Sequence, residues 1–210
     1  MGILRAAWVP DDDPEREWQV AADLAVSWVE QEARAQDAAA VLVLNAFGAE
    51  QHVPVLRSFA QRHSVTTPRA GRDRVGSGIG PVLAYVPDAR TLDFATGLAR
   101  NSSLAVVESV GLLPLGGWAA HLTALDLTRP GGESPALDDR LAEALDRLKF
   151  YGNNAYGPSF DRQQATRVLS DLHSAGLLDR EVVISARAAR GVSPAGLDRL
   201  RQLISGVKIR

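Results

Sequence analysis

The chain has 210 residues, 46% of them hydrophobic and 23% charged, a composition typical of one globular domain or of one domain with a smaller appendage. It contains no cysteine, which excludes disulfides, thiolate zinc sites, iron–sulfur clusters and cysteine nucleophiles. The net charge of −2 gives no reason to expect nucleic acid as a partner. No run approaches the roughly 20 apolar residues of a membrane span, and the chain does not start like a signal peptide, so we expect a cytoplasmic protein without membrane contact.

Short β-rich runs alternate with longer helical stretches over residues 1–130, and this alternation is typical of a mainly parallel sheet. We predict an α/β fold with roughly six strands and with helices on both faces of the sheet, the strands lying at 3–9, 40–47, 64–67, 81–86, 104–109 and 122–128. Helices are predicted at 14–36, 51–62 and 89–100. The first of these has Asp13 as its N-cap, Pro14 in its first turn and Trp18 on its buried face.

One short phrase occurs twice, as WVPD at 8–11 and as YVPD at 85–88. Each copy is typical of the end of a buried strand, followed by a proline stop and by an aspartate, Asp11 or Asp88, that opens a helix. The two copies indicate either two strand–helix units of one design or two ordinary turns that arose separately. We favour the second interpretation, because such turns are common.

The segment at 69–80, RAGRDRVGSGIG, is basic and rich in glycine, and it has no periodic apolar pattern. We predict a mobile loop that joins two βαβ-like halves of a sheet domain spanning 1–130. A phosphate-binding loop follows a strand and opens a helix, whereas this segment precedes the strand at 81–86, and no GxxxxGK[ST] pattern occurs. The alternative to a simple linker is a lid that orders when a ligand binds.

The segment at 129–135, RPGGESP, is the best candidate boundary, because the β-rich runs largely stop beyond it. Residues 136–210 carry helical stripes of apolar residues, and they predict a helical C-terminal appendage that packs on the sheet or forms a small bundle. Residues 161–164 resemble a capping box, and Ser193 with Pro194 is a good helix start. Residues 182–184 fit either a short helix or a strand.

Ligands of open parallel sheets bind at the carboxyl ends of the strands, and there we place the candidate ligand-binding residues Asn45, Asp88, Glu108 and Ser109. The turns that contain Asn45 and Glu108 also offer glycine and small polar groups to a phosphate. Together with Asp11, the carboxylates of Asp88 and Glu108 would suit Mg²⁺ and a phosphorylated ligand. The favoured alternative is that both aspartates cap helices and that Glu108 is solvated.

The stretch at 150–160, FYGNNAYGPSF, places four aromatic residues, two asparagines and two glycines in one interhelical loop. This composition is typical of recognition surfaces, because it combines rigid apolar area with adaptable hydrogen bonds. We therefore take Tyr151, Asn153, Asn154 and Tyr156 as candidate ligand- or partner-binding residues. The favoured alternative is that the aromatic rings anchor the appendage to the sheet domain.

Motifs of catalysis and of metal binding are absent from the sequence. No two of the four histidines have the i, i+4 spacing of a helical metal site, no GxSxG elbow occurs, and His173 is predicted to be a structural imidazole on an apolar helix. The last helices form a mildly basic tail. A helix-turn-helix that reads DNA is a minor hypothesis for these helices. Its basic residues are Arg187, Arg190, Arg199, Arg201, Lys208 and Arg210.

These observations predict a non-catalytic protein that binds a small ligand or a protein partner, and we assign it no catalytic residue, metal or cofactor. Self-association stays open. The alternatives are a Mg²⁺-dependent enzyme for a phosphorylated or nucleotide substrate and a DNA-associated regulator. The strand–helix–strand at 80–108 resembles the second RecA-like lobe of helicases, but it matches no catalytic motif of that family, and no family is assigned.

Overall fold

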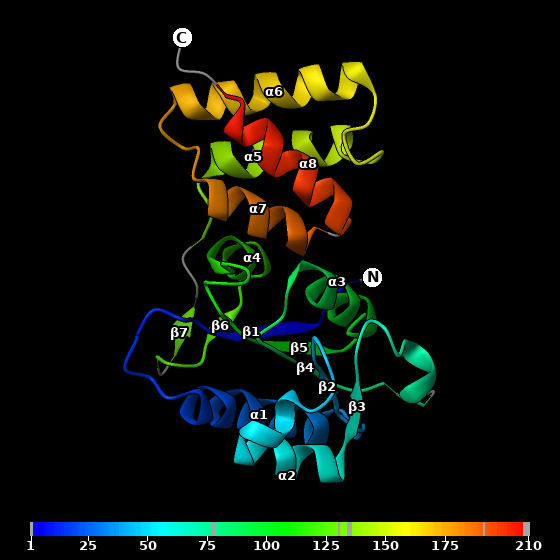
Figure 1. Cartoon of the computed structure of the whole chain (residues 1–210). Helices are drawn as coiled ribbons and strands as arrows, with labels where there is room; N and C mark the ends of the chain where they lie inside the picture. Colours follow the sequence, from blue (N-terminus) through cyan, green and yellow to red (C-terminus); the bar gives the residue numbers. More distant parts are fainter. Residues whose placement is uncertain (1, 77–78, 130, 134–135, 191, 208–210) are drawn as a thin grey trace.

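The computed structural model describes residues 2–76, 79–129, 131–133, 136–190 and 192–207, and it shows an α/β fold with a helical C-terminal region (Figure 1). The described residues form a sheet of seven strands in the order β3-β2-β4-β5-β1-β6-β7. Every neighbouring pair from β3 to β6 is parallel, and the short β7 runs antiparallel to β6 at the edge. The predicted fold class is therefore confirmed. The strands are β1 (Arg5–Val9), β2 (Val41–Val43), β3 (Ser64–Thr66), β4 (Val82–Tyr85), β5 (Ser103–Val107), β6 (Leu125–Asp126) and β7 (Gly132–Glu133).

Helices cover both faces of the sheet. Helices α1 and α2 pack on one face, whereas α3 and α4 pack on the other, with α7, α8, α5 and α6 stacked beyond α4 (Figure 1). None of the described helices is both long enough and apolar enough to cross a bilayer. The helices are α1 (Trp18–Ala35), α2 (Pro54–Arg62), α3 (Ala89–Leu98), α4 (Gly116–Leu122), α5 (Asp139–Tyr151), α6 (Ser159–Ser174), α7 (Arg180–Ala189) and α8 (Pro194–Ser205), with short 3₁₀ turns η1 (Ala49–His52) and η2 (Arg72–Arg74).

The central strands are apolar throughout because their side chains alternate between two cores. In β1, Ala6 and Trp8 enter the core under α3 and α4, whereas Ala7 and Val9 enter the core under α1 and α2. A strand covered on both faces has no solvent-exposed side. Burial of alternate residues in two separate cores thus explains why these runs lack the polar alternation of a half-exposed strand.

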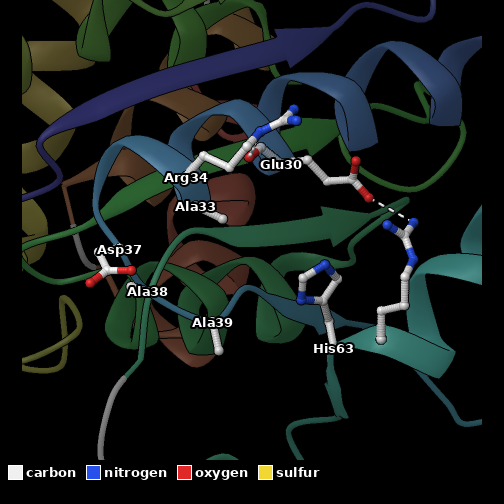
Figure 2. Close-up of a pocket in the computed structure, with 8 residues that line it drawn as sticks. Glu30, Ala33, Arg34, Asp37, Ala38, Ala39 and His63 are labelled. Carbon is white, nitrogen blue, oxygen red and sulfur yellow. Dashed lines mark hydrogen bonds and ion pairs between the residues drawn. The ribbon is translucent and has the colours of Figure 1, made fainter.

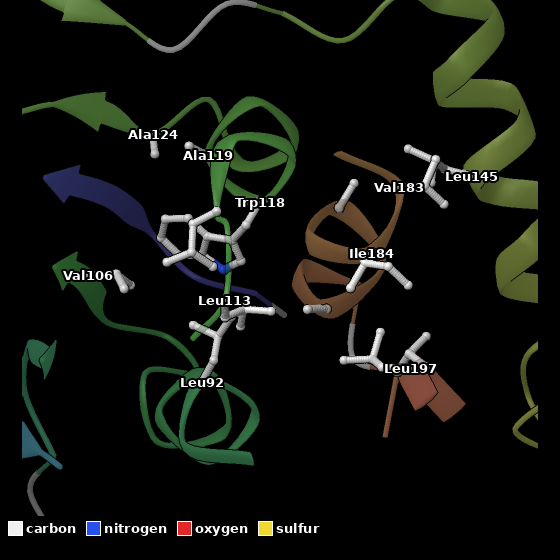
Figure 3. Packing of buried hydrophobic residues seen from close by; sticks show 14 of the residues in the cluster. Leu92, Val106, Leu113, Trp118, Ala119, Ala124, Leu145, Val183, Ile184 and Leu197 are labelled. Atoms are coloured by element: carbon white, nitrogen blue, oxygen red, sulfur yellow. The ribbon is translucent and has the colours of Figure 1, made fainter. Parts of the chain in front are cut away.

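The core under α3 and α4 continues into the C-terminal helices. Trp118 of α4 is completely buried between the sheet and α7, and Ile184 and Leu197 extend the same cluster into α7 and α8 (Figure 3). A Cβ built on Gly117 would lie 2.1 Å from the Val182 carbonyl oxygen, so only glycine permits this close approach of α4 to α7. The C-terminal helices contact one another, and α7 and α8 pack on α3 and α4, so the appendage is a small bundle that packs on this side of the sheet domain.

The first helix begins at Trp18 rather than at Pro14, and the prediction that Asp13 is its N-cap is wrong. Residues 13–16 form a turn in which Arg16 bonds to the Pro10 carbonyl and, at 3.0 Å, to the Asp12 carboxylate. The local contacts of Arg16 therefore delay the helix by one turn. Similarly, the predicted helix at 51–62 is divided into η1 and α2, because Pro54 occupies the first turn of α2.

Two further boundaries differ from the predictions. Helix α6 begins at Ser159, immediately after Pro158, so the capping box proposed at 161–164 is wrong. The predicted strand at 122–128 is reduced to β6, because Leu122 still belongs to α4. In contrast, the helix start at Ser193 is confirmed, since its hydroxyl accepts the Gly196 N–H at 3.2 Å, and residues 182–184 are helical.

The glycine-rich segment at 69–80 is partly anchored to the sheet domain. It contains η2, the side chain of Val75 is buried, and Arg72 bonds to the Gly97 carbonyl at the end of α3. Residues 77 and 78 lie outside the described residues. The mobility expected of this segment stays a prediction.

Candidate functional site

The carboxyl edge of the sheet contains two places where neighbouring strands send the chain to opposite faces. Strand β2 continues into α2 on one face, whereas its neighbour β4 continues into α3 on the other. In the same way, β1 continues into α1 and its neighbour β5 continues into α4. Such switch points are where ligand crevices open in doubly wound sheets. The chain therefore has two positions to consider.

The β1/β5 switch point is closed by carboxylates that bind backbone N–H groups. Glu108 is buried, and its two carboxylate oxygens accept the N–H groups of Asp11, at 3.0 Å, and of Leu115. The Asp11 carboxylate in turn accepts the Val110 N–H at 3.0 Å. The interpretations of Asp11 as a helix cap and of Glu108 as a solvated group are thus both wrong, because the two residues join β1 to β5.

The environment of Glu108 raises the pKa of its carboxyl group. Burial is the largest cause; the backbone bonds from Leu115 and Asp11 lower the pKa, and the charges of Asp11 and Asp12 raise it. The burial cost therefore exceeds the stabilisation of the carboxylate by the two N–H groups. Because both oxygens already accept bonds, this carboxylate has a structural role at the switch point.

The β2/β4 switch point is held by the side-chain amide of Asn45. Its Nδ2 donates to the Val86 carbonyl at 2.9 Å, and its Oδ1 accepts the Asp88 N–H at 3.0 Å. The Asp88 carboxylate accepts the Thr91 N–H at 2.7 Å, which confirms the prediction that Asp88 caps a helix. The two copies of the VPD phrase thus serve different purposes, since only the second opens a helix directly.

A large hollow lies between the chain after β4 and the loop after β5, on the side of the sheet that α3 covers. Its volume is about 710 Å³, within the range of small-molecule sites. The start of α3, the loop after β5 and the starts of α7 and α8 surround it. The lining residues are Asp88, Ala89, Arg90, Val110, Gly111, Leu112, Pro114, Glu181, Pro194, Asp198 and Arg201.

The walls of this hollow combine apolar and charged side chains. Val110 and Leu112 are 50% and 53% exposed on the loop after β5. Arg201 is bound to Asp198 at 2.7 Å, whereas Arg90 lies in the first turn of α3 without a salt bridge to any described residue. The hollow therefore offers a ligand an apolar wall and one arginine, Arg90, beside the carboxylates of Asp88 and Glu181.

A smaller pocket of about 250 Å³ opens at the β2/β4 switch point on the side of α1, bounded by Trp18 and Tyr85. Trp18 is 45% exposed, so its predicted place on a buried helix face is wrong. The delayed start of α1 puts this ring in the first turn of the helix, beyond the edge of the sheet. Composition gives no signal for this site, because an indole at helical spacing is more often part of a core.

The remaining predicted site residues lie apart from these hollows. Ser109 is partly exposed and bridges to Leu113, with its carbonyl accepting the N–H groups of Leu112 and Leu113. In the 150–160 loop, Asn153 and Asn154 are exposed and Tyr151 is partly buried. The sequence alone did not separate these environments.

Tyr156 is completely buried, so its interpretation as a ligand-binding residue is not supported. Its hydroxyl donates to the Leu148 carbonyl at 3.1 Å, and its backbone has a positive φ of 57°. The ring anchors the loop to α5 within the appendage, whereas the alternative expected aromatic anchors between the appendage and the sheet domain. Arg199 adds a further anchor, because it donates to the Ala155 carbonyl at 2.9 Å.

The basic residues of the C-terminal helices do not form one exposed stripe among the described residues. Arg187 is completely buried, and the Arg190 side chain is largely buried against Asp146 at 3.4 Å. Arg199 and Arg201 bond to neighbouring groups, as described above, whereas Lys208 and Arg210 lie outside the described residues. The geometry gives no support to the DNA-reading hypothesis.

No group of three or more histidine, aspartate or glutamate side chains is arranged to hold a metal ion in the described part of the chain. Asp11, Asp88 and Glu108 are each engaged by backbone N–H groups rather than gathered around a common point.

His173 is exposed on α6, so the prediction of a buried structural imidazole is wrong. Half-buried His121 has a pKa lowered to about 4, mainly by burial and then by the charge of Arg190.

Another hollow, of about 460 Å³, lies at the opposite, amino edge of the sheet (Figure 2). It is lined by the last turn of α1, the link at 37–39 and the end of α2. Arg62 binds Glu30 across it at 2.7 Å, and the pKa of His63 is lowered by burial and by the charge of Arg62, with Glu30 opposing. It lies away from both switch points, and its facing charges are matched, so it is the weaker candidate.

Fold and site together define an open, doubly wound α/β protein with its hollows at the carboxyl edge of the sheet. Comparisons with known protein families, with curated proteins and with solved structures found no match to this chain.

Proposed function

We propose that this chain is a non-catalytic binding protein whose ligand occupies the carboxyl edge of the sheet. The observation that carries the proposal is the 710 Å³ hollow between the ends of β4 and β5 at this edge. Its volume suits a small molecule, and its position is the usual one for ligands of open α/β sheets. Exposed Leu112 and Arg90 would contact the apolar and the anionic part of such a ligand, respectively.

The engagement of the acidic residues supports a binding role over a catalytic one. Asp88 accepts a backbone N–H as a helix cap, and both oxygens of Glu108 accept backbone N–H groups. A general base needs a lone pair directed at substrate, and a Mg²⁺ site needs several gathered oxygen ligands. The absence of cysteine further supports a location in a reducing cytoplasm.

A thermal-shift panel on the full chain tests this proposal, with nucleotides, sugar phosphates, Mg²⁺ and a short DNA duplex as probes. A ligand present at about one hundred times its dissociation constant adds about 2.7 kcal/mol to the free energy of unfolding. We expect at least one anionic organic probe to stabilise the protein, and we expect Arg90→Glu and Leu112→Asp to remove that effect. Arg34→Glu, at the amino-edge hollow, is the matched control and should leave it unchanged.

Loss of the effect in Arg34→Glu but not in the two edge variants would contradict the proposed location. Silence across the whole panel would contradict the small-ligand form of the proposal. It would direct the search to a macromolecular partner.

A second candidate function is the binding of a second copy of the chain through the 150–160 loop. Phe150 and Phe160, which flank this loop, are 71% and 61% exposed, and Asn153 and Asn154 are exposed between them. Aromatic area beside amide groups is typical of interface cores with hydrogen-bonding rims.

Light scattering after size exclusion tests this candidate. The wild type should be a dimer, and Phe150→Ser and Phe160→Ser together should convert it to a monomer. A wild-type monomer at every concentration would contradict this candidate.

A further inference from the structure

The small pocket at the β2/β4 switch point has the shape of a site for one flat ring. It has a volume of about 250 Å³ and is lined by Trp18, Leu44, Asn45, Ala49, Tyr85 and Val86. A cavity of about 150 Å³ is enough for benzene. The Trp18 and Tyr85 rings lie 6.5 Å apart between centroids at an angle of 78°. They form two walls at nearly a right angle, so a flat ring can stack on one of them while its edge meets the other.

The exposure of Trp18 distinguishes it from every other tryptophan of the chain. Trp8, Trp28 and Trp118 are buried in the two cores, whereas Trp18 opens onto this pocket. Its indole therefore lies beside solvent while one side of it contacts Tyr85. A partly exposed indole next to an apolar pocket provides a stacking surface that the fold itself does not use.

Asn45 supplies the polar group at this pocket, in a fixed orientation. Because Nδ2 donates to the Val86 carbonyl and Oδ1 accepts the Asp88 N–H, the two ends of the amide are identified. One N–H and one lone pair then stay available on opposite sides of this exposed amide, because its paired edge is used by Val86 and Asp88. Val86, which the amide holds, has a φ of 47°, a conformation that is rare for a β-branched residue and typical of strained functional sites.

We infer that this pocket binds the neutral heteroaromatic ring of a nucleoside-type ligand. The ring stacks on Trp18, and an amino group on its edge donates to the remaining lone pair of Asn45 Oδ1. The sugar and any charged substituent then lie outside the apolar pocket, along the same edge of the sheet. This inference rests on the proposed function, because it names the ligand class for one part of the same edge.

A fluorescence titration of the full chain with adenosine tests the inference, with excitation of tryptophan. Because Trp18 is the one exposed indole of the four, we expect saturable quenching that is absent in Trp18→Phe. By calorimetry, Trp18→Ala should weaken adenosine binding about 5- to 150-fold, the range for losing one stacked base, and Trp18→Phe should weaken it less. Val20→Ala, an exposed position on the same helix but outside the pocket, should bind as wild type does.

Purine riboside, which lacks the amino group of adenosine, tests the role of Asn45. The wild type should bind it more weakly than it binds adenosine. Asn45→Ala should bind the two nucleosides equally weakly. The inference is overturned if adenosine does not quench the protein, or if Trp18→Ala, shown to be folded by circular dichroism, binds it with wild-type affinity. Either result leaves the proposed function to be judged separately by the probe panel and by the Arg90 and Leu112 variants.

Discussion

Single side chains close one switch point of the sheet and leave the other open. Glu108 and Asp11 join the ends of β5 and β1 by accepting backbone N–H groups, whereas Asn45 joins the ends of β2 and β4 and leaves a pocket beside it. The difference lies in exposure: Glu108 is buried and its two oxygens bond within the fold, whereas the exposed Asn45 amide keeps one donor and one acceptor toward solvent. The chemistry of a site at this edge is therefore determined by which polar atoms the fold leaves available.

Replacement of Glu108 by glutamine tests its structural role. The amide has nearly the same shape, but its NH₂ group would face one of the two backbone N–H donors, from Asp11 or Leu115. We expect Glu108→Gln to lower the free energy of unfolding by about 1–2 kcal/mol, because one buried donor loses its acceptor. Urea denaturation measures this loss, with Glu143→Gln on the exposed side of α5 as the control that should change nothing. Equal stability of both variants would show that Glu108 is not engaged as described.

The lowered pKa of His121 predicts a pH dependence of stability. The folded-state pKa is about 4 and the unfolded value about 6.5, so between these values the unfolded chain binds the additional proton. His121 therefore makes stability fall as pH falls from 6.5 through 4. Urea denaturation at several pH values should give a shallower decline for His121→Gln than for the wild type. Parallel curves would contradict the lowered pKa.

At the scale of elements, the two aspartates that precede α1 and α3 make a direct comparison. Asp88 caps α3, whereas Asp13 lies in an exposed turn before α1. Asp88→Ala should therefore cost about 1 kcal/mol of stability, and Asp88→Asn, which keeps the capping oxygen, much less. Asp13→Ala should cost less than about 0.5 kcal/mol, as for other surface substitutions. Thermal unfolding of the three variants measures these losses of stability. A larger loss for Asp13→Ala than for Asp88→Ala would show that Asp13 is a helix cap after all.

Elements of this chain were predictable where a local rule acts alone. The strands were located because continuous apolar runs follow from burial on both faces, and α8 was located because Ser193 is an ordinary cap. Particular contacts that follow no periodicity or capping rule decided the rest. The start of α1 depends on Arg16 reaching Pro10, and the reduction of β6 depends on α4 extending to Leu122. No local pattern carries this information.

The candidate site was predictable in position but not in composition. Asn45 and Asp88 were placed at the carboxyl edge because strand ends can be located from the sequence. Arg90, Leu112 and Trp18 were missed, since exposure on a helix start or a loop depends on how distant segments pack. For the same reason Tyr156, expected as an exposed residue for binding, is buried inside the helical region.

At the scale of the whole molecule, one core joins the sheet to the C-terminal helices, with Trp118 at their junction. Gly117→Ala should separate α4 from α7 and lower the free energy of unfolding by about 2 kcal/mol, as expected for overpacking. Gly116→Ala, whose added methyl group meets nothing within 4 Å, should be neutral or slightly stabilising. Circular dichroism and tryptophan emission should report one shared transition for each protein. Separate transitions for the two probes would contradict a shared core.

The central claim is that ligands bind at the carboxyl edge of the sheet, and amide chemical-shift mapping tests it most directly. A ¹H–¹⁵N spectrum of the full chain would be recorded with the pooled organic probes of the thermal-shift panel. We expect the shifted amides to cluster at 44–49, 85–90 and 110–114, around the two hollows of this edge. Shifts confined to 33–39 and 62–63 would place the site at the amino edge instead. Either that result or unshifted amides at the carboxyl edge would contradict the account.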